Sequence, residues 1–382
     1  MRLQAEIVGR MADIPAEAWD ALDPTGNPFL RHAFLEALES SGCVGGDTGW
    51  HPHHLVARDA GGRIVGAVPQ YLKLHSWGEF VFDWSWAQSY ARAGLGYYPK
   101  QLSAIPFTPV TGPRLLVGAA TGSAVRDALA RLLRESARQG QLSGAHVNFT
   151  LPGDQAALEG AGFMRRHDCR FVWVNRGYRD FADFLERFRA EKRKKARRER
   201  RRIREQGIGF RTLRGAEIDA ALWETIFAFS EHTFLRHGNA HYLSAGFLDL
   251  IARRMPGAIM VKLAERHGEP LAAAIFFQGG SSLHGRYWGA REHVDCLHFE
   301  ACYYQGIEYC IEHGLASFDP GTHGEHKLAR GFEPTLTHSA HWLAHPGFAA
   351  AIGRHLERER AAVDDYVAAV SSHLPFPRGP HA

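Results

Sequence analysis

The sequence predicts an α/β protein made of two similar units joined by a long basic helix. Its 382 residues exceed what one hydrophobic core usually organises, and 45% apolar with 23% charged residues is typical of a globular chain. The order of helical and strand patterns in the first half returns in the second half, and a run of Lys and Arg separates the two.

The first unit opens with two helical patterns and a β-hairpin whose strands flank a Gly-containing turn. An aromatic stretch, Trp77–Tyr98, follows, and then a Pro-rich loop that cannot continue a central strand or a helix. The remaining order is helix, strand, short helix and strand. The predicted elements are Pro15–Leu22, Phe29–Glu39, His54–Arg58, Arg63–Val68, Val125–Arg138, Ala145–Thr150, Asp154–Gly160 and Cys169–Val174.

The second unit repeats this order. Phe149 precedes Gly162-Phe163 by the same spacing as Phe318 precedes Gly331-Phe332, and the two sets are offset by 169 residues. Two copies of one α/β unit are the simplest interpretation. The predicted elements are Ala220–Arg236, Phe247–Arg254, Ala258–Glu265, Pro270–Gln278, Ser282–Trp288, Leu297–His313, Leu315–Asp319 and Leu336–Leu343, and a last helix covers Ala349–Val370.

The segment between the units predicts a single helix over Phe181–Gly207. Its first half has an apolar face, but from Glu191 to Glu205 it carries ten Lys or Arg and three Glu, a net charge of +7 in a chain whose total is +4. The rest of the chain is therefore slightly acidic. We expect this second half to lack a core-facing side and either to project into solvent or to lie against an acidic surface.

The N-terminus lacks the apolar region of a signal peptide, and the longest apolar run, Leu271–Phe277, is far shorter than a membrane span. We therefore expect a cytoplasmic protein. The five cysteines have neither a zinc nor a disulfide spacing, which favours free thiols, and no closed set of His, Cys or acidic ligands predicts a metal site.

Short motifs in both units carry a family resemblance. In this order around a basic helix they resemble the FemAB-like branch of the GNAT N-acyltransferase superfamily, over about Asn27–Phe348. The motifs are Tyr97-Tyr-Pro-Lys100 and Ile105-Pro-Phe-Thr-Pro109 in the first unit, and Arg286-Tyr-Trp-Gly-Ala, Glu300-Ala-Cys-Tyr-Tyr, Phe318-Asp-Pro-Gly321 and His326-Lys-Leu-Ala-Arg-Gly-Phe332 in the second.

The resemblance implies an α/β (α+β) fold of two tandem GNAT-like mixed-sheet domains, and amide-bond formation on an amine. The expected domains are 1–178, the acceptor-binding candidate; 179–207, the basic connector; 208–348, the catalytic candidate; and 349–382, a C-terminal helix and tail. In the best-known members aminoacyl-tRNA is the donor and a peptidoglycan-precursor peptide is the acceptor. A small amine or another peptide is an equally open acceptor here.

The donor can be narrowed from the segment after the third strand of the second unit. GNAT enzymes that use acetyl-CoA bind its pyrophosphate there on a Gly-rich loop. This chain has no glycine between Gly289 and Gly306, and Glu292 and Asp295 add negative charge. The segment therefore disfavours acetyl-CoA. The resemblance implies aminoacyl-tRNA as co-substrate, with acyl-CoA as the alternative and no certain cofactor.

The loop Asp319–Lys327 follows the carboxyl end of a strand, where α/β sites usually lie. His323 or Glu325 could accept the amine proton, and Lys327 and Arg330 could hold a phosphate or stabilise an oxyanion. Asp83 is a further candidate base. The alternative is a polar surface loop followed by a capped helix.

Two sets of residues are candidate substrate contacts. In the first unit aromatic and basic residues could line an acceptor groove, and in the second unit strand and helix residues could contact the substrate. Each is also compatible with simple packing. The sets are Tyr97, Tyr98, Lys100, Phe107, Thr108 and Arg114, and Arg286, Tyr287, His298 and Glu300.

The basic helix is the candidate nucleic-acid surface, through Lys192, Arg193, Lys194, Lys195, Arg197, Arg198 and Arg201. Such a cluster fits the tRNA backbone without reading bases, and it also fits anionic lipid or polyphosphate. A solvated arm is the alternative interpretation. A catalytically silent module that binds nucleic acid or an envelope precursor therefore stays open beside the enzyme.

Overall fold

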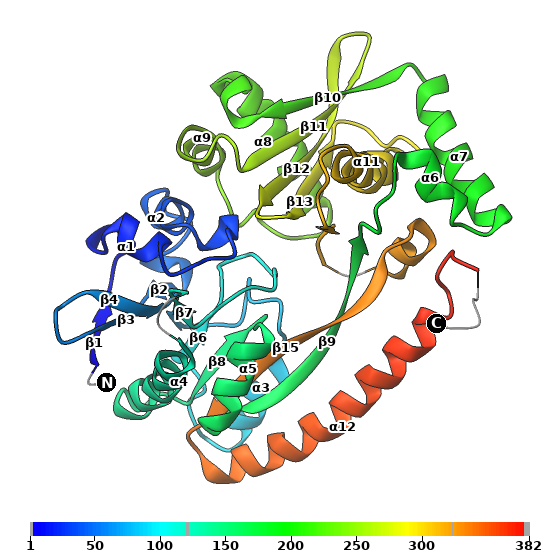
Figure 1. Cartoon of the computed structure of the whole chain (residues 1–382). Helices are drawn as coiled ribbons and strands as arrows, with labels where there is room; N and C mark the ends of the chain where they lie inside the picture. The colour runs from blue at the N-terminus through cyan, green and yellow to red at the C-terminus, as the bar shows by residue number, and fades with distance from the viewer. Residues whose placement is uncertain (1–2, 120–121, 323, 378–382) are drawn as a thin grey trace. The chain divides into compact units, whose positions relative to one another are not determined.

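The computed structural model describes residues 3–119, 122–322 and 324–377, and it forms two compact units. The first comprises residues 1–168 and 336–365, and the second comprises 169–335 and 366–382 (Figure 1). As compact bodies they place residues 336–348 with the first unit, whereas the sequence placed them in the second domain. The domain boundaries predicted from the sequence follow the two repeated units, which is a different division of the chain. Those boundaries stay a prediction.

The first unit contains two sheets. One has the order β1-β3-β4-β7, and strands of the other follow the order β15-β8-β6-β5-β2. Helix α4 packs its apolar face, Val125, Leu129 and Leu133, into a core with the hairpin and β8. The elements are β1 (Gln4–Val8), α1 (Ala16–Asp20), α2 (His32–Ser40), β2 (Trp50–Pro52), β3 (His54–Arg58), β4 (Ile64–Val68), β5 (Tyr71–Lys73), α3 (Trp84–Arg92), β6 (Lys100–Ser103), β7 (Leu116–Val117), α4 (Gly122–Gln139), β8 (Gly144–Asn148) and α5 (Pro152–Gly160).

The second unit is built on strands in the order β10-β11-β12-β13-β14-β9, of which only β13 and β14 run parallel. Its elements are α6 (Phe181–Glu186), α7 (Ala190–Glu205), β10 (Ile208–Arg214), α8 (Ala220–Arg236), α9 (Ala245–Arg254), β11 (Ile259–Arg266), β12 (Glu269–Gly279), β13 (Ser282–Ala290), α10 (Leu297–Phe299), a π-helical turn (Glu300–Tyr304), α11 (Gln305–Glu312), β14 (Ser317–Asp319) and a 3₁₀ segment (Glu325–Arg330).

Helix α8 packs very closely on β13. A Cβ atom on Gly289 would lie 2.0 Å from the carbonyl of Phe229, so only glycine lets the helix backbone approach the strand. The ring of Tyr287 lies 5.2 Å from that of His241, which follows α8. Because side chains alternate along a strand, Trp288 points to the other face, where its ring lies 5.5 Å from His298 of α10.

The repeat seen in the sequence returns in the strands that close each copy. Strand β9 covers Met164–Val174 and β15 covers Glu333–Leu343, so their bounds differ by the predicted offset. Gly162 and Gly331, just before them, both have positive φ, 89° and 87°. Each strand also contributes residues to both compact units, since the units divide at 168/169 and 335/336.

The prediction of one connecting helix is wrong. The helix breaks at residues 187–189 into α6 and α7, because the backbone N–H of Arg189 donates to the carbonyl of Pro375 (2.8 Å) instead of continuing the helix. The expectation that the second half has no core side is also wrong. Ala196, Glu199 and Ile203 form a buried stripe on α7.

The last helix, α12, covers Pro346–Ser371. Of the helices in the part of the chain that the structure describes, none is both long and apolar enough to span a membrane.

Candidate functional site

A cavity of about 270 Å³ lies in the second unit beside β13. Strand β14 pairs with β13 only at residues 282–284, so the rest of β13 is not covered on that side. We call the cavity the β13 pocket. It is lined by Ala274, Ile275, Phe276, Gly285, Arg286, Tyr287, Trp288, His298, Cys302, Tyr303, Pro320, Gly321, Thr322, His326 and Lys327.

A β-bulge shapes the strand wall of this pocket. Ile275 of β12 lies opposite Tyr287, but its neighbour Phe276 lies opposite Gly285, so Arg286 is the extra residue. A bulge re-aims a side chain and commonly lies beside active sites. Gly285 lets the chain after β14 pass close by, because a Cβ there would be 3.3 Å from Pro320.

A π-helical turn shapes the opposite wall. It covers Glu300–Tyr304, and two of its buried residues, Cys302 and Tyr303, line the pocket. Burial raises the pKa of both side chains, so the thiol and the phenol are protonated. Sequence periodicity cannot reveal such a turn, which is why neither residue was a candidate. π-Helical turns are frequent at functional sites.

Lys327, a candidate from the sequence, is one of the residues that line the pocket. Its Nζ donates to the carbonyls of Gly321 (2.8 Å) and Thr322 (2.6 Å), and its side chain is buried. Burial lowers the pKa of Lys327 to about 8. An ammonium has three N–H donors, and the third has no partner among the described residues.

Two histidines complete the polar lining. The Nε2 atom of His326 lies 2.8 Å from the hydroxyl of Tyr303. Burial, helped by the charges of Lys327 and Arg330, lowers the pKa of His326. Burial lowers the pKa of His298 to about 4, so its ring is neutral at pH 7.

Other candidates of the second unit lie elsewhere. Arg330 is buried, with Nη2 at 2.9 and 3.0 Å from the carboxylate of Glu199 and its guanidinium 3.4 Å over the ring of Phe299. Glu300 is paired with Arg200.

The remaining two candidates belong to the loop after β14. Glu325 is exposed and accepts a hydrogen bond from the hydroxyl of Tyr366 (2.9 Å). His323 lies outside the described residues.

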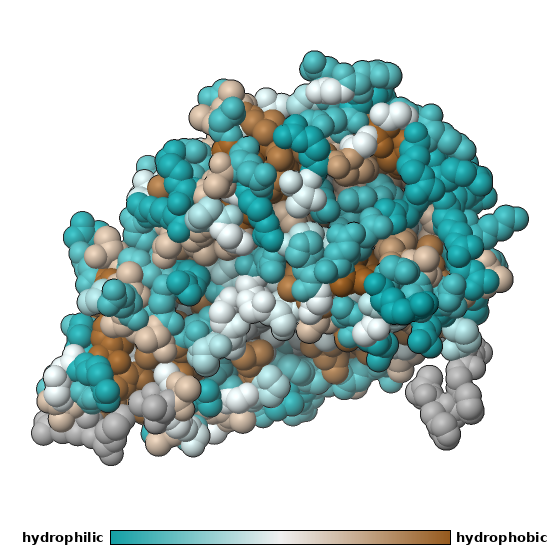
Figure 2. Space-filling view, turned by 45° about the horizontal axis from the view of Figure 1, so that its top comes forward, coloured by the Kyte–Doolittle hydropathy of each residue, from teal (hydrophilic) through white to brown (hydrophobic). Residues whose placement is uncertain are grey.

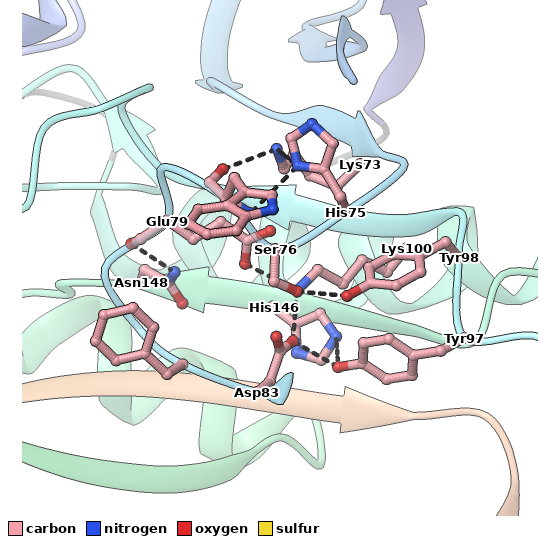
Figure 3. Close-up of polar contacts among 12 residues, drawn as sticks. Lys73, His75, Ser76, Glu79, Asp83, Tyr97, Tyr98, Lys100, His146 and Asn148 are labelled. Atoms are coloured by element: carbon pink, nitrogen blue, oxygen red, sulfur yellow. Dashed lines mark hydrogen bonds and ion pairs between the residues drawn. The ribbon is translucent and has the colours of Figure 1, made fainter. Parts of the chain in front are cut away.

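In the first unit a buried ionic cluster surrounds Lys100 (Figure 3). Its Nζ donates to Glu79 Oε2 (2.8 Å), to Ser76 Oγ (2.9 Å) and to Asp83 Oδ2. Tyr97 donates to the same Asp83 oxygen (2.6 Å). We call these five residues the Lys100 cluster. Of its members, sequence analysis missed Glu79 and Ser76, which lie on an irregular loop.

Burial sets the protonation of this cluster. It raises the pKa of Glu79 to about 7. Burial also acts to raise the pKa of Asp83, but the ammonium of Lys100 outweighs it and holds that pKa well below the usual range. Glu79, and not Asp83, is therefore the carboxylate matched to proton transfer near neutral pH.

The other first-unit candidates are packed within the protein. Tyr98 is half-buried and its hydroxyl lies 2.8 Å from Ser76 Oγ. Phe107 and Thr108 are buried. Arg114 is fully buried, donates to the carbonyl of Val110 (2.6 Å), and has its pKa lowered to about 10 by burial.

Helix α7 presents a cationic face opposite its buried stripe. At 100° per residue the exposed side chains of Lys194, Arg197, Arg198 and Arg201 cluster on one side of the helix. We call these four residues the cationic face. The right-hand side of the surface in Figure 2, the side on which α7 lies in Figure 1, is largely hydrophilic.

Of the other candidate nucleic-acid residues, Arg193 and Lys195 flank this face, whereas Lys192 lies on the side of the buried stripe. Lys195 is exposed, and Lys192 and Arg193 are half-buried. On the buried side Arg200 pairs with Glu300 and Glu308, which fixes the helix against an acidic surface, one of the two arrangements expected from the sequence.

Two acidic side chains of the segment after β13 form ion pairs with arginines from other elements. Glu292 pairs with Arg266 (2.7 Å) and Asp295 with Arg202 (2.8 Å). Cys296 has a left-handed backbone (φ 69°) before α10. Within residues 3–119, 122–322 and 324–377, no group of three or more His, Cys, Asp or Glu side chains is arranged to hold a metal ion.

Comparison with solved structures shows the same fold at low identity. The crystal structure of FemX matches with a TM-score of 0.55 and 13% identity, covering 92% of this chain and 100% of that one. L-PGS from Bacillus licheniformis matches with a TM-score of 0.53 and 9% identity, covering 95% and 100%. None of the curated proteins compared matches this chain.

A family model described as FemAB-like, peptidoglycan biosynthesis/recognition, matches residues 10–378. That match covers nearly the whole chain, through both units and the basic helix. The chain therefore belongs to the FemAB-like family, and it shares its α/β fold with the solved structure of FemX.

Proposed function

We propose that the protein is an N-acyltransferase that joins an acyl or aminoacyl group from a carrier to an amine of a peptidoglycan precursor. Membership in a family described by peptidoglycan biosynthesis and recognition supports the acceptor class. The observation that carries the proposal is the lining of the β13 pocket. Hydrogen-bond donors of Arg286 and Lys327 and the ring nitrogens of two histidines surround a cavity large enough for an acyl group.

The reaction needs an oxyanion site and a proton acceptor. The amine nitrogen attacks the acyl carbonyl carbon, a C–N bond forms, and the bond from that carbon to the carrier's oxygen or sulfur breaks. The third N–H of Lys327 stabilises the developing oxyanion. His326, neutral and hydrogen-bonded to Tyr303, takes the amine proton, which then goes to the leaving group or solvent.

The cationic face of α7 supports a polyanionic carrier, and we propose aminoacyl-tRNA. Its four exposed cations need no base-specific contact to hold a phosphate backbone. The segment after β13 supports the same choice over acyl-CoA. That segment has no glycine between Gly289 and Gly306, so its backbone cannot closely approach two phosphates.

In the first unit we propose that the Lys100 cluster shapes the acceptor side without contacting the acceptor. Lys100, Glu79 and Asp83 are each at most 3% exposed, so they act by fixing the loop 76–83 on which two of them lie.

A transfer assay tests the proposal. Purified protein is incubated with a peptidoglycan-precursor peptide bearing a free side-chain amine and with either charged total tRNA or a panel of acyl-CoAs. Mass spectrometry then detects the amide product. We expect product with charged tRNA, its loss after ribonuclease treatment, and a fall in kcat of about 100-fold or more for His326→Gln. His237→Gln, an exposed histidine after α8, is the matched control and should retain activity.

If product forms only from an acyl-CoA, the carrier is acyl-CoA and not tRNA, and the proposed amide-forming reaction stands. If no carrier gives an amide while the protein still binds the precursor or tRNA, the chain is a binding module and the proposal is wrong.

A further inference from the structure

The electrostatic character of the β13 pocket limits which acyl group it accepts. This inference rests on the proposed function, because it takes the pocket as the place of the acyl chain. We propose that the pocket selects a small acyl chain without positive charge at its far end and excludes basic chains such as lysyl or arginyl.

Charge is the first argument. Among the described residues that line the pocket, none carries a carboxylate, whereas Arg286 and Lys327 carry cationic groups. The acids nearest to it in the chain are neutralised by other cations. Asp319 is paired with Arg170 (2.8 Å) and Glu300 with Arg200 (3.0 Å). A basic acyl chain would lose its hydration and gain no counter-ion, and like-charge contacts are a strong means of rejecting a ligand.

Size is the second argument. Small-molecule sites usually measure about 300–1,000 Å³, and this pocket measures about 270 Å³. It therefore takes a short acyl chain and leaves the carrier outside. The carbonyl and the α-amino group beside it stay at the mouth, where the acceptor amine attacks, so selection acts on the far end of the chain.

The remaining lining suits a neutral polar end. His298 presents ring nitrogens and Tyr303 presents a hydroxyl, and both are uncharged at pH 7. A hydroxyl or amide at the end of the acyl chain can both donate to and accept from these groups. The rings of Trp288 and Tyr303 add apolar walls for the methylene carbons.

Two isosteric donors test the inference. The homoseryl and 2,4-diaminobutyryl esters of one tRNA differ only in a terminal hydroxyl against a terminal ammonium. We expect a kcat/KM at least about tenfold higher for homoseryl, which corresponds to 1.4 kcal/mol or more. Arg286→Gln should narrow this ratio and Arg286→Glu should reverse it. Arg291→Gln, five residues further and outside the pocket lining, is the matched control and should keep the ratio.

The outcomes separate the two proposals. If neither ester, nor any other donor, yields an amide, the proposed function fails. If amide forms and the two esters react equally, or diaminobutyryl reacts faster in the wild type, the reaction stands and the charge selection is wrong. An unchanged ratio in both Arg286 variants would also contradict it, because Arg286 is the side chain of the lining that a β-bulge directs.

Discussion

Nη2 of Arg330 lies 2.9 and 3.0 Å from the two carboxylate oxygens of Glu199, and both residues are buried. The pair fastens α7 to the segment after β14, and Tyr304 donates to the same carboxylate (2.6 Å). Arg330 was a catalytic candidate in the sequence, but its contacts are those of a structural ion pair.

Breaking this pair should destabilise the protein. Arg330→Met leaves the Glu199 charge buried without its partner, which costs about 3–5 kcal/mol. The double variant Arg330→Met/Glu199→Met should lose much less, because no charge is then left behind. Urea denaturation measures both. An Arg330→Met variant of wild-type stability and no transfer activity would restore the catalytic interpretation.

The Lys100 cluster makes a similar prediction in the first unit. Lys100→Met removes the only cation that touches both Glu79 and Asp83 among the described residues, and the unfolding free energy should fall by about 3–5 kcal/mol. Adding Glu79→Gln and Asp83→Asn should recover part of that loss. If the single variant is as stable as wild type by thermal unfolding, the cluster does not hold the loop in place.

Charge reversal on the cationic face should weaken tRNA binding. For Lys194→Glu/Arg198→Glu/Arg201→Glu we expect a Kd at least about tenfold higher. The slope of log K against the logarithm of the salt concentration should become less steep by about 2–3. Fluorescence anisotropy at several salt concentrations measures both. The control triple Arg236→Glu/Arg253→Glu/Arg254→Glu, on α8 and α9, changes net charge equally. Equal weakening by the two triples would mean that total charge, and not α7, determines binding.

Gly289 should not tolerate even a methyl group. In Gly289→Ala the new Cβ would lie 2.0 Å from the Phe229 carbonyl and 2.3 Å from the Ser230 nitrogen, so α8 must shift as a whole. We expect a loss of about 1–3 kcal/mol. Gly209→Ala, in β10, meets nothing within 4 Å and should change stability by less than about 0.5 kcal/mol. Comparable melting temperatures for the two variants would contradict this packing.

Acid should destabilise the first unit through His146. Burial lowers the pKa of His146 to about 3, so the folded protein keeps this ring neutral while the unfolded chain protonates it below about 6.5. The unfolded state thus binds more protons, and this contribution to stability is complete above pH 6.5 and is lost as pH falls towards 3, by about 1.4 kcal/mol per pH unit. His146→Gln should flatten the slope in chemical denaturation between pH 6 and 4. An equal slope in both proteins would assign acid sensitivity to other groups.

Much of the fold could be predicted because local patterns determine it. Helix α8 has the bounds expected from the sequence, and the hairpins of both units appear where a turn separates two apolar runs. Strand β10 was missed because its alternation is mostly polar, as suits the edge of a sheet. The break before α7 was missed because its cause, the carbonyl of Pro375, is distant in sequence.

The residues of the site were harder to predict from the sequence, because their contacts also come from distant parts of the chain. Lys327 and Arg286 could be named as candidates because they belong to recognisable motifs, and both line the β13 pocket. The partner of Arg330 lies 131 positions away, so no local pattern could show that Glu199 neutralises it. Cys302, Tyr303 and Glu79 owe their places to a π-helical turn and an irregular loop, which have no periodicity to read.

The division of β9 and β15 between the two units has a consequence for synthesis on the ribosome. Residues Gly144–Asn148 of β8 pair with Ser339–Leu343, which are translated almost two hundred residues later. Until then the edge of β8 has no strand on that side and is open to wrong pairing. A nascent or truncated chain ending near residue 178 should therefore depend on chaperones or aggregate, and the N-terminal unit can complete its fold only after residues 339–343 have been translated.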